Sequence, residues 1–481
     1  MYNATLAAIL TIAAALGFTL IEPPRVTATT CATLQGDLNT ALEGTRLELP
    51  PGVQCVGHVV LPASHGGTLT TAGFSLPRGF RALASDHGRF AELRSPDNQP
   101  ALTTAAGAML WTVEALEITS ASAKGTGVSI GTNLETTVAQ LPKAIKLSHV
   151  YVHGDPITGL KRGVALHAVD AIVEDSTITD IRAVGEDSQA LWINNGPGPY
   201  TIRNNDVQGS SEPILVGGDR VSIPDLVPGD ILIEGNDVSK PLAWRALKGW
   251  NSKNLLEVKN GRRILIRGNR FANNWPDAQS GYAILFTPRN QYGSDPWTVI
   301  EDVTFEGNTV RNVSSAINIA GDDDLKPSQR THGITLRNNL LVVDRVAMGG
   351  DGRCLMVGRG PQQLTYSQNT CISNGGSAVY TYAGGAQSAI ADAVFDKNIW
   401  IRNTYGFFAT SGQEGTGALA TFYPGAVWTS NVMAGGSIAA YKAGTFVPSV
   451  AELMGQFVDP AAGDYRIRAD STFAGLGSDR R

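Results

Sequence analysis

An acid and a base stand two residues apart in the segment NLLEVKNGRRILIRGN, which runs from Asn254 to Asn269. Because side chains alternate along a strand, Glu257 and Lys259 would lie on the same face of an extended segment. A carboxylate can bind a cation, and a lysine held beside a second positive charge loses its proton more readily and can act as a base. The pair therefore fits proton abstraction next to a bound anion, provided that the fold brings another cation close.

A comparison of neighbouring strands supplies that second cation. The strands that align by their polar ends are ALWINN (190–195), ILVGGD (214–219), LLEVKN (255–260), LFTPRN (285–290) and INIAGD (317–322). In this alignment Lys259 and Arg289 lie at one level, followed by Asn260 and Asn290. Neighbouring strands of a sheet lie ~4.8 Å apart, so we expect Glu257, Lys259 and Arg289 to share one exposed patch.

Long connections would build the walls of a groove beside this patch. Those near residues 240–254 and 270–281 carry several tryptophans. Sugar rings stack on aromatic side chains, so we expect Trp250 and Trp275, together with Asn260 and Asn290, to contact a glycan.

The strands belong to a repeat that covers most of the chain. Segments such as TIRNNDV, LIEGNDV and LIRGNRF end in an asparagine, and these asparagines recur every 29 to 39 residues. They are Asn205, Asn236, Asn269, Asn308, Asn339, Asn369, Asn398 and Asn431, with weaker copies near Ser176 and Val150. A persistent period of about 30 residues indicates a solenoid, here of strands. Asparagine tolerates the tight bend and can bond to the coils above and below.

This pattern resembles the right-handed parallel β-helix of the pectate-lyase-like superfamily, over about residues 60 to 475. The resemblance implies an all-β solenoid of about 11 coils with an N-terminal capping helix. The expected order is a signal peptide (1–28), an N-terminal cap (29–60, with a helix over 33–44), the β-helix (61–455) and a closing coil (456–481). Helical spacing is clear only in TLQGDLNTALEG, residues 33–44.

The chain also has a local resemblance to the chondroitinase-B-like and alginate lyases of this fold. Those enzymes place metal-binding glutamates and a catalytic lysine on one coil and a catalytic arginine on the next. The resemblance implies Lys259 and Arg289 as catalytic residues, with Glu257 and Asp219 as ligands of a possible calcium ion. The implied reaction is β-elimination on a uronic acid. Lys259 would remove H5, and Arg289 or calcium would neutralise the adjacent carboxylate.

Two other functions fit the same residues. A glycoside hydrolase would need two carboxyl groups, which Asp219, Glu257 and Asp322 could supply. An exported β-helix could also bind glycans or surfaces without turnover, and Glu257 beside Lys259 could be a solvated structural pair. Epimerisation of a uronate also remains open. The partner is expected to be a polysaccharide, most simply an anionic one, and the oligomeric state is left open.

The composition of the chain limits the compartments in which the protein could reside and the classes of partner that it could bind. Charged residues make up 17% of the 481, the net charge is −5 and no basic stripe is present, which argues against nucleic acid. An apolar N-terminal run precedes VTA at 26–28, a small-residue cleavage site, and no later segment could span a membrane. We expect a secreted or periplasmic protein. Its four cysteines then favour two disulfides, Cys31–Cys55 and Cys354–Cys371, rather than a zinc site.

Overall fold

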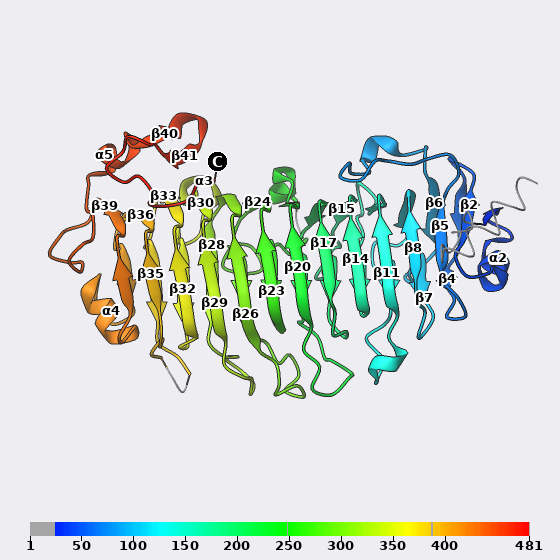
Figure 1. The fold of residues 1–481 in the computed structure, drawn as a ribbon, viewed down its shortest axis with the longest axis horizontal. Helices are drawn as coiled ribbons and strands as arrows, with labels where there is room; N and C mark the ends of the chain where they lie inside the picture. The colour runs from blue at the N-terminus through cyan, green and yellow to red at the C-terminus, as the bar shows by residue number, and fades with distance from the viewer. Residues whose placement is uncertain (1–24, 248, 386–387, 481) are drawn as a thin grey trace, which may run out of the picture.

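The computed structural model describes residues 25–247, 249–385 and 388–480, and they form a right-handed parallel β-helix. Each coil contributes one strand to each of three sheets, and the strands of one sheet lie side by side along the molecule (Figure 1). Within the described residues the sheets have 14, 13 and 12 strands, slightly more than the expected coil number. Every neighbouring pair in these sheets is parallel, as a solenoid of successive coils requires.

Sheet A consists of β1 (Val26–Ala28), β2 (Thr45–Leu49), β5 (Gly67–Thr71), β8 (Trp111–Glu114), β11 (Lys143–Ser148), β14 (Val169–Glu174), β17 (Tyr200–Arg203), β20 (Gly229–Glu234), β23 (Gly261–Arg267), β26 (Ile300–Glu306), β29 (His332–Arg337), β32 (Gln362–Ser367), β35 (Val394–Asp396) and β38 (Val427–Thr429).

Sheet B consists of β3 (Gln54–Val56), β6 (Ala91–Ser95), β9 (Leu116–Ser120), β12 (Tyr151–His153), β15 (Thr177–Ile181), β18 (Asp206–Gly209), β21 (Asp237–Ser239), β24 (Arg270–Asn274), β27 (Thr309–Val313), β30 (Leu340–Val343), β33 (Thr370–Ser373), β36 (Ile399–Ile401) and β39 (Val432–Ala434).

Sheet C consists of β4 (Val59–Leu61), β7 (Leu102–Thr104), β10 (Thr126–Ile130), β13 (Arg162–Leu166), β16 (Gln189–Ile193), β19 (Glu212–Val216), β22 (Leu256–Val258), β25 (Tyr282–Phe286), β28 (Ser315–Ala320), β31 (Leu355–Gly358), β34 (Val379–Tyr382) and β37 (Phe407–Ala409).

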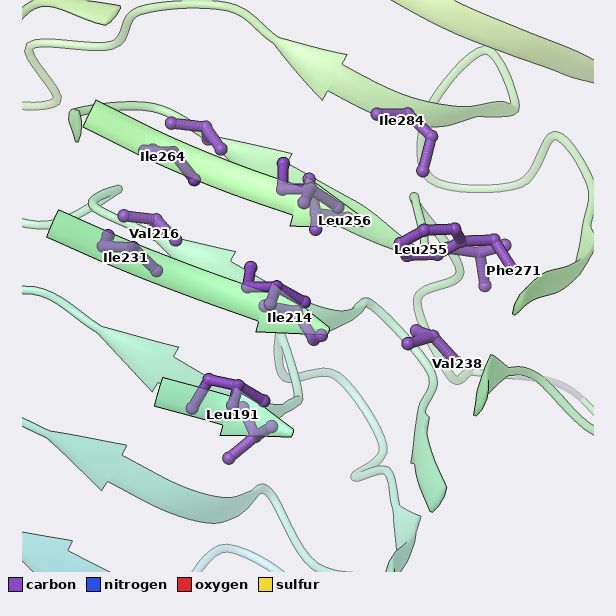
Figure 2. Close-up of a cluster of buried hydrophobic side chains, with 14 of the residues drawn as sticks. Leu191, Ile214, Val216, Ile231, Val238, Leu255, Leu256, Ile264, Phe271 and Ile284 are labelled. Carbon is purple, nitrogen blue, oxygen red and sulfur yellow. The ribbon is translucent and has the colours of Figure 1, made fainter. Parts of the chain in front are cut away.

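The inward side chains of sheet C form continuous apolar columns. Leu191, Ile214, Leu256 and Ile284 occupy matching positions on four successive strands, and none of them is exposed to solvent (Figure 2). Burying each such side chain contributes about 1.5–3 kcal/mol before entropy is subtracted. These columns fix the register of the strands, and the outward side chains between them are therefore held at defined positions.

The predicted asparagine column is confirmed by its hydrogen bonds. The backbone N–H of Asn236 donates to Oδ1 of Asn269 at 2.9 Å, and Asn269 donates in the same way to Asn308. Seven such bonds link all eight asparagines, and the last, Asn431, only accepts. The column extends upstream through Ser176 and Val150, the two positions of the weaker repeats. Each buried amide thus finds its partner one coil away, which explains the recurrence of asparagine.

Helix α2 (Leu34–Thr40) covers the N-terminal end of the stack, as expected for a cap (Figure 1). Leu34 and Leu38 pack into the core of the β-helix. The predicted disulfide Cys31–Cys55 is present and joins the start of the cap to β3. The predicted signal peptide lies mostly outside the described residues, and its last three residues form strand β1.

The C-terminal end differs from the expected closing coil. Residues 456–481 contain an antiparallel pair, β40 (Phe457–Asp459) with β41 (Asp464–Ile467), which lies with α5 (Val450–Met454) over the last strands of sheet B (Figure 1). Phe457 and Phe473 pack there against Ile399, an apolar residue that sheet B presents outward. The end of the stack is covered by α4 (Thr416–Phe422), whose buried face joins the main core.

Two further features complete the fold. The disulfide Cys354–Cys371 is present as predicted and links the residue before β31 to β33 across the buried interior. The short helix α3 (Arg345–Met348) follows β30. Among the described residues, helices are too short or too polar to be candidates for crossing a membrane.

Candidate functional site

Glu257 lies in a column of outward side chains on sheet C and is almost completely buried. Strand register places it between Leu215 on β19 and Leu285 on β25, and its exposed fraction is 2%. The expectation that Glu257 lies in an exposed patch is therefore wrong, because these two leucines flank it. Burial raises the pKa of Glu257, Lys259 opposes this rise, and the negative charge of Glu212 adds to it. Its Oε2 atom has no hydrogen-bond partner within the described structure.

Lys259 and Arg289 are neighbours, although the register of their strands differs from the sequence alignment. Glu257 pairs with Leu285, an offset of 28 residues, whereas the alignment assumed 30. Beyond the ends of the strands, the backbone N–H of Arg289 nevertheless donates to the carbonyl oxygen of Lys259 at 3.0 Å. The backbone N–H of Thr287 donates to the carbonyl oxygen of Val258, so between these two bonds one chain advances by two residues and the other by one. The two cations therefore come from adjacent coils at the same level.

Lys259 extends from the end of β22 towards its acidic neighbour. Its Nζ atom lies 3.6 Å from Oε1 of Glu257, an ion-pair distance. A glycine makes room for the lysine stem. At Gly218, φ is +90° and a Cβ would lie 3.1 Å from Cδ of Lys259, which explains the glycine after Gly217 in ILVGGD.

Arg289 is held by two aspartates of the next coil. Its guanidinium lies 2.9 Å from a carboxylate oxygen of Asp323 and 2.9 Å from one of Asp324. The Asp323 side chain is fully buried and also accepts the backbone N–H of Asn290 at 2.7 Å. The acidic run at the end of INIAGD, Asp322 to Asp324, thus orients the arginine through its last two residues.

Lys259 and Arg289 both line a groove of about 720 Å³ on the outside of sheet C. Six cationic side chains line it, Lys161, Arg162, Lys253, Lys259, Arg289 and Lys326, together with four acids, Glu186, Asp187, Glu212 and Asp219. The lining thus has two more cationic than acidic groups. Trp192 and Tyr292 add aromatic surface. A long polar trough with excess positive charge suits an extended ligand that carries negative charge.

The floor of the groove contains a cation that the sequence did not single out. Arg162 on β13 lies over the ring of Trp192 at 4.0 Å and donates to Oε1 of Gln189 at 2.9 Å. Burial lowers the pKa of Arg162 to about 10, which leaves it charged at neutral pH. The spacing of Arg162, Gln189 and Glu212 matches the strand repeat, and that match was the signal available in the sequence.

Lys253 is a second groove cation that the sequence reasoning missed. It forms ion pairs with Asp187 and with buried Glu212, the latter at 3.4 Å. Because it belongs to the connection between β21 and β22, no strand pattern pointed to it.

Other residues of the expected site occupy different positions. Asp219 lines the groove, and its charge raises the pKa of Tyr292. Asn260 and Asn290 are buried, and each accepts a backbone N–H through Oδ1, from Val299 and Asp295 respectively. Both asparagines therefore shape the connections that form the groove rather than line it.

Two further expected residues lie beside the groove. Trp250 and Trp275 line a separate small pocket. Asp322, part of the alternative hydrolase set, is bound to Arg330 and Arg359 and is absent from the residues that line the groove.

The residues implied for calcium do not make a calcium site. Calcium takes six to eight oxygen ligands. Glu257 is buried between leucines with the ammonium of Lys259 beside it, and Asp219 lies at the groove surface. Within the described residues, three or more acids, histidines or cysteines do not gather in a way that could hold a metal ion.

Solved structures with the same fold include enzymes that act on polysaccharides. A mannuronic-acid-specific polysaccharide family 6 lyase from human gut microbiota superposes with a TM-score of 0.52 at 11% identity, over 90% of this chain and 93% of the other. The A-module of the Azotobacter vinelandii mannuronan C-5 epimerase AlgE6 gives 0.53 at 11%, over 85% and 96%. The alginate lyase AlyGC of the PL6 family gives 0.55 at 13%, over 95% and 56%. At these identities the similarity shows the fold alone.

Sequence comparison identifies the family. No curated protein matches the chain. A family model described as a right-handed β-helix region matches residues 163–419, which is more than half of the 481 residues and includes the groove strands β16, β19, β22 and β25. The chain therefore belongs to the right-handed β-helix family.

Proposed function

We propose that this protein is an exported enzyme that cleaves a uronic-acid-containing polysaccharide by β-elimination in the groove on sheet C. The observation that carries this proposal is that Lys259 and Arg289, whose backbones are hydrogen-bonded to each other, both line the groove, and we assign them the roles of base and carboxylate-binding cation. The excess of cations along the groove supports an anionic chain as the substrate. Two disulfides support export.

The proposed chemistry assigns one role to each residue. The guanidinium of Arg289 binds the uronate carboxylate and stabilises the negative charge that develops when H5 leaves. Nζ of Lys259 accepts the H5 proton, the electron pair forms the C4–C5 double bond, and the C4–O bond breaks. The departing O4 takes a proton from solvent. The reaction therefore needs no oxidant or reductant.

Glu257 is the acidic neighbour of the proposed base, Lys259. Lys259 must be uncharged to accept a proton. Burial between Leu215 and Leu285 raises the pKa of Glu257, so this carboxyl is more often protonated than an ordinary glutamate. A protonated Glu257 carries no negative charge with which to pair the ammonium of Lys259.

The structural neighbours support this class of substrate. Two are described as lyases, one of them specific for mannuronic acid and the other for alginate, and one as a mannuronan C-5 epimerase. Lyase and epimerase reactions on a uronate both begin with removal of H5. The pair Lys259 and Arg289 supplies what that shared step requires.

A panel of anionic and neutral polysaccharides tests the proposal. A lyase yields ultraviolet absorbance from the conjugated product together with new chain ends. New chain ends without absorbance, on a neutral glycan, would contradict β-elimination and favour hydrolysis. A changed uronate composition without cleavage would show epimerisation, and retention of a glycan without any product would show a binding protein.

A further inference from the structure

A second pocket lies next to the groove, on the other side of the connection between β21 and β22. It has a volume of about 140 Å³ and is lined by Lys240, Trp244, Trp250, Trp275, Ser210 and Ser252, among others. Asn251 lines both the pocket and the groove, so the two adjoin at this residue. The size suits one small ligand or the end of a chain, whereas the groove suits a chain.

The lining of this pocket carries two cations, Lys240 and Arg245, and one acid, Asp277, whose Oδ2 atom already accepts the backbone N–H of Ser252 at 2.8 Å. Lys240 is fully buried, and its Nζ atom donates to Oδ1 of Asn274 at 2.7 Å. An ammonium has three donor hydrogens, so two remain for other acceptors. Nε1 of Trp250 and the hydroxyls of Ser210 and Ser252 are buried and have no hydrogen-bond partner within the described structure. Buried donors of this kind are costly unless an acceptor reaches them.

The walls of the pocket are aromatic and held in place. Trp244 and Trp250 meet edge to face at 6.3 Å, and the guanidinium of Arg182 lies 3.7 Å from the Trp250 ring centre. Trp275 is buried on the far wall. Fixed rings of this kind accept the apolar face of a sugar at little entropic cost.

We propose that this pocket binds the carboxylate of a uronic sugar, with its oxygens against Lys240 and Trp250 and its ring beside the tryptophans. The site would hold one end of the chain that the groove processes. The inference rests on the proposed function for the source of the ligand, but binding at the pocket can be measured without turnover. Burial lowers the pKa of Lys240 to about 7, so an anion bound beside it should stabilise the ammonium form.

The test is a titration of the full protein with glucuronate, glucose and acetate, followed by tryptophan fluorescence and calorimetry. We expect glucuronate to change the fluorescence and to bind at least about tenfold more tightly than glucose or acetate, since it alone offers both a carboxylate and a ring. In buffers of different ionisation enthalpy above pH 7, binding should take up protons at Lys240.

Two variants localise the binding. Lys240→Met removes the cation at similar size, and Trp250→Phe keeps an aromatic ring but removes the N–H donor. Each should weaken glucuronate binding about tenfold or more, the effect expected for a charge-assisted hydrogen bond. The matched control Lys143→Met changes an exposed lysine of β11 and should leave the affinity unchanged.

Several outcomes would overturn the inference. Glucose binding as tightly as glucuronate would contradict recognition of a carboxylate, and equal binding of acetate would contradict a sugar site. Wild-type affinity in both pocket variants would place the ligand elsewhere. If glucuronate binds as expected but no polymer is cleaved, the proposed function fails while the pocket assignment stands. If polymer is cleaved but glucuronate does not bind, the pocket assignment fails while the proposed function stands.

Discussion

The backbone N–H of Arg289 donates to the carbonyl oxygen of Lys259 at 3.0 Å, which fixes two cations of adjacent coils side by side on the wall of one groove. Their side chains are held by different acids, Lys259 by Glu257 and Arg289 by Asp323 and Asp324. Two like charges are therefore kept together without sharing a partner. In the proposed function the guanidinium of Arg289 binds the carboxylate of the ligand, and Lys259 acts as the base in its uncharged form.

Replacing Glu257 by glutamine should remove a pH dependence of stability. Burial raises the pKa of Glu257 above its ordinary value of 4.5. At a pH between the ordinary and the raised pKa, the folded protein therefore binds more protons than the unfolded chain. The contribution of Glu257 to stability is fully present below pH 4.5 and is lost as the pH rises through the raised pKa. As the pH rises from acidic to mildly alkaline, the unfolding free energy of Glu257→Gln should therefore increase by about 1–3 kcal/mol relative to that of the wild type.

Denaturant unfolding at a series of pH values measures this difference. The control is Glu43→Gln, which changes an exposed acid near the N-terminal cap. A constant difference between Glu257→Gln and the wild type at all pH values would contradict the role assigned to burial.

Replacing Arg289 by alanine should affect both activity and stability. The substitution removes the group that binds the uronate carboxylate, so kcat/KM should fall by at least about a hundredfold. It also takes the cation from the fully buried carboxylate of Asp323, which should cost about 1–3 kcal/mol of unfolding free energy.

Arg337→Ala is the matched control for stability. Arg337 is paired with Glu306 but its side chain is 57% exposed, so its loss should cost less than about 1 kcal/mol. Equal loss of stability in the two variants would show that burial of Asp323 does not distinguish them.

Removal of calcium should leave activity unchanged. Glu257 faces the ammonium of Lys259 and Asp219 lines the groove, and two acids alone supply too few oxygen ligands for calcium. Initial rates on a uronate polymer should be the same after treatment with a chelator and after addition of excess calcium. A rate that falls with the chelator and returns with calcium would show that substrate and protein together build a metal site.

The asparagine column should be a major source of stability. Asn269 accepts hydrogen bonds from the backbone N–H and the side-chain amide of Asn236. Its own backbone N–H and side-chain amide donate to Oδ1 of Asn308. Asn269→Ala should therefore cost about 2–4 kcal/mol, since it leaves buried groups unpaired on two coils. Asn39→Ala, at an exposed position of α2, provides the comparison. Similar midpoints of unfolding for the two variants would contradict this account.

The repeat made the fold predictable because one physical requirement recurs in every coil. A tight turn with a buried amide needs asparagine, so Asn236, Asn269 and Asn308 revealed both the solenoid and its period. The adjacency of Lys259 and Arg289 followed from the same period, although the strand register differed by two residues. Cysteine parity and spacing indicated the two disulfides.

The remaining features depend on contacts that have no local signature. The burial of Glu257 comes from Leu215 and Leu285, which are far from it in sequence. Lys253 enters the groove from a connection, whose path no strand pattern determines. The C-terminal segment packs on the outer face of sheet B, where Ile399 is apolar. The alternation of apolar and polar residues in the C-terminal segment did not distinguish this packing from a further coil.

The most direct test of the account compares wild-type protein with Lys259→Ala on a uronate polymer, measuring substrate binding and ultraviolet absorbance of the product in parallel. Loss of a general base should lower kcat by about 10²–10⁴-fold, while the dissociation constant of the polymer should change by less than about tenfold, because the base acts in the transition state. A variant that binds the polymer but forms no conjugated product is the predicted result. Wild-type rates of product formation in Lys259→Ala would contradict the account.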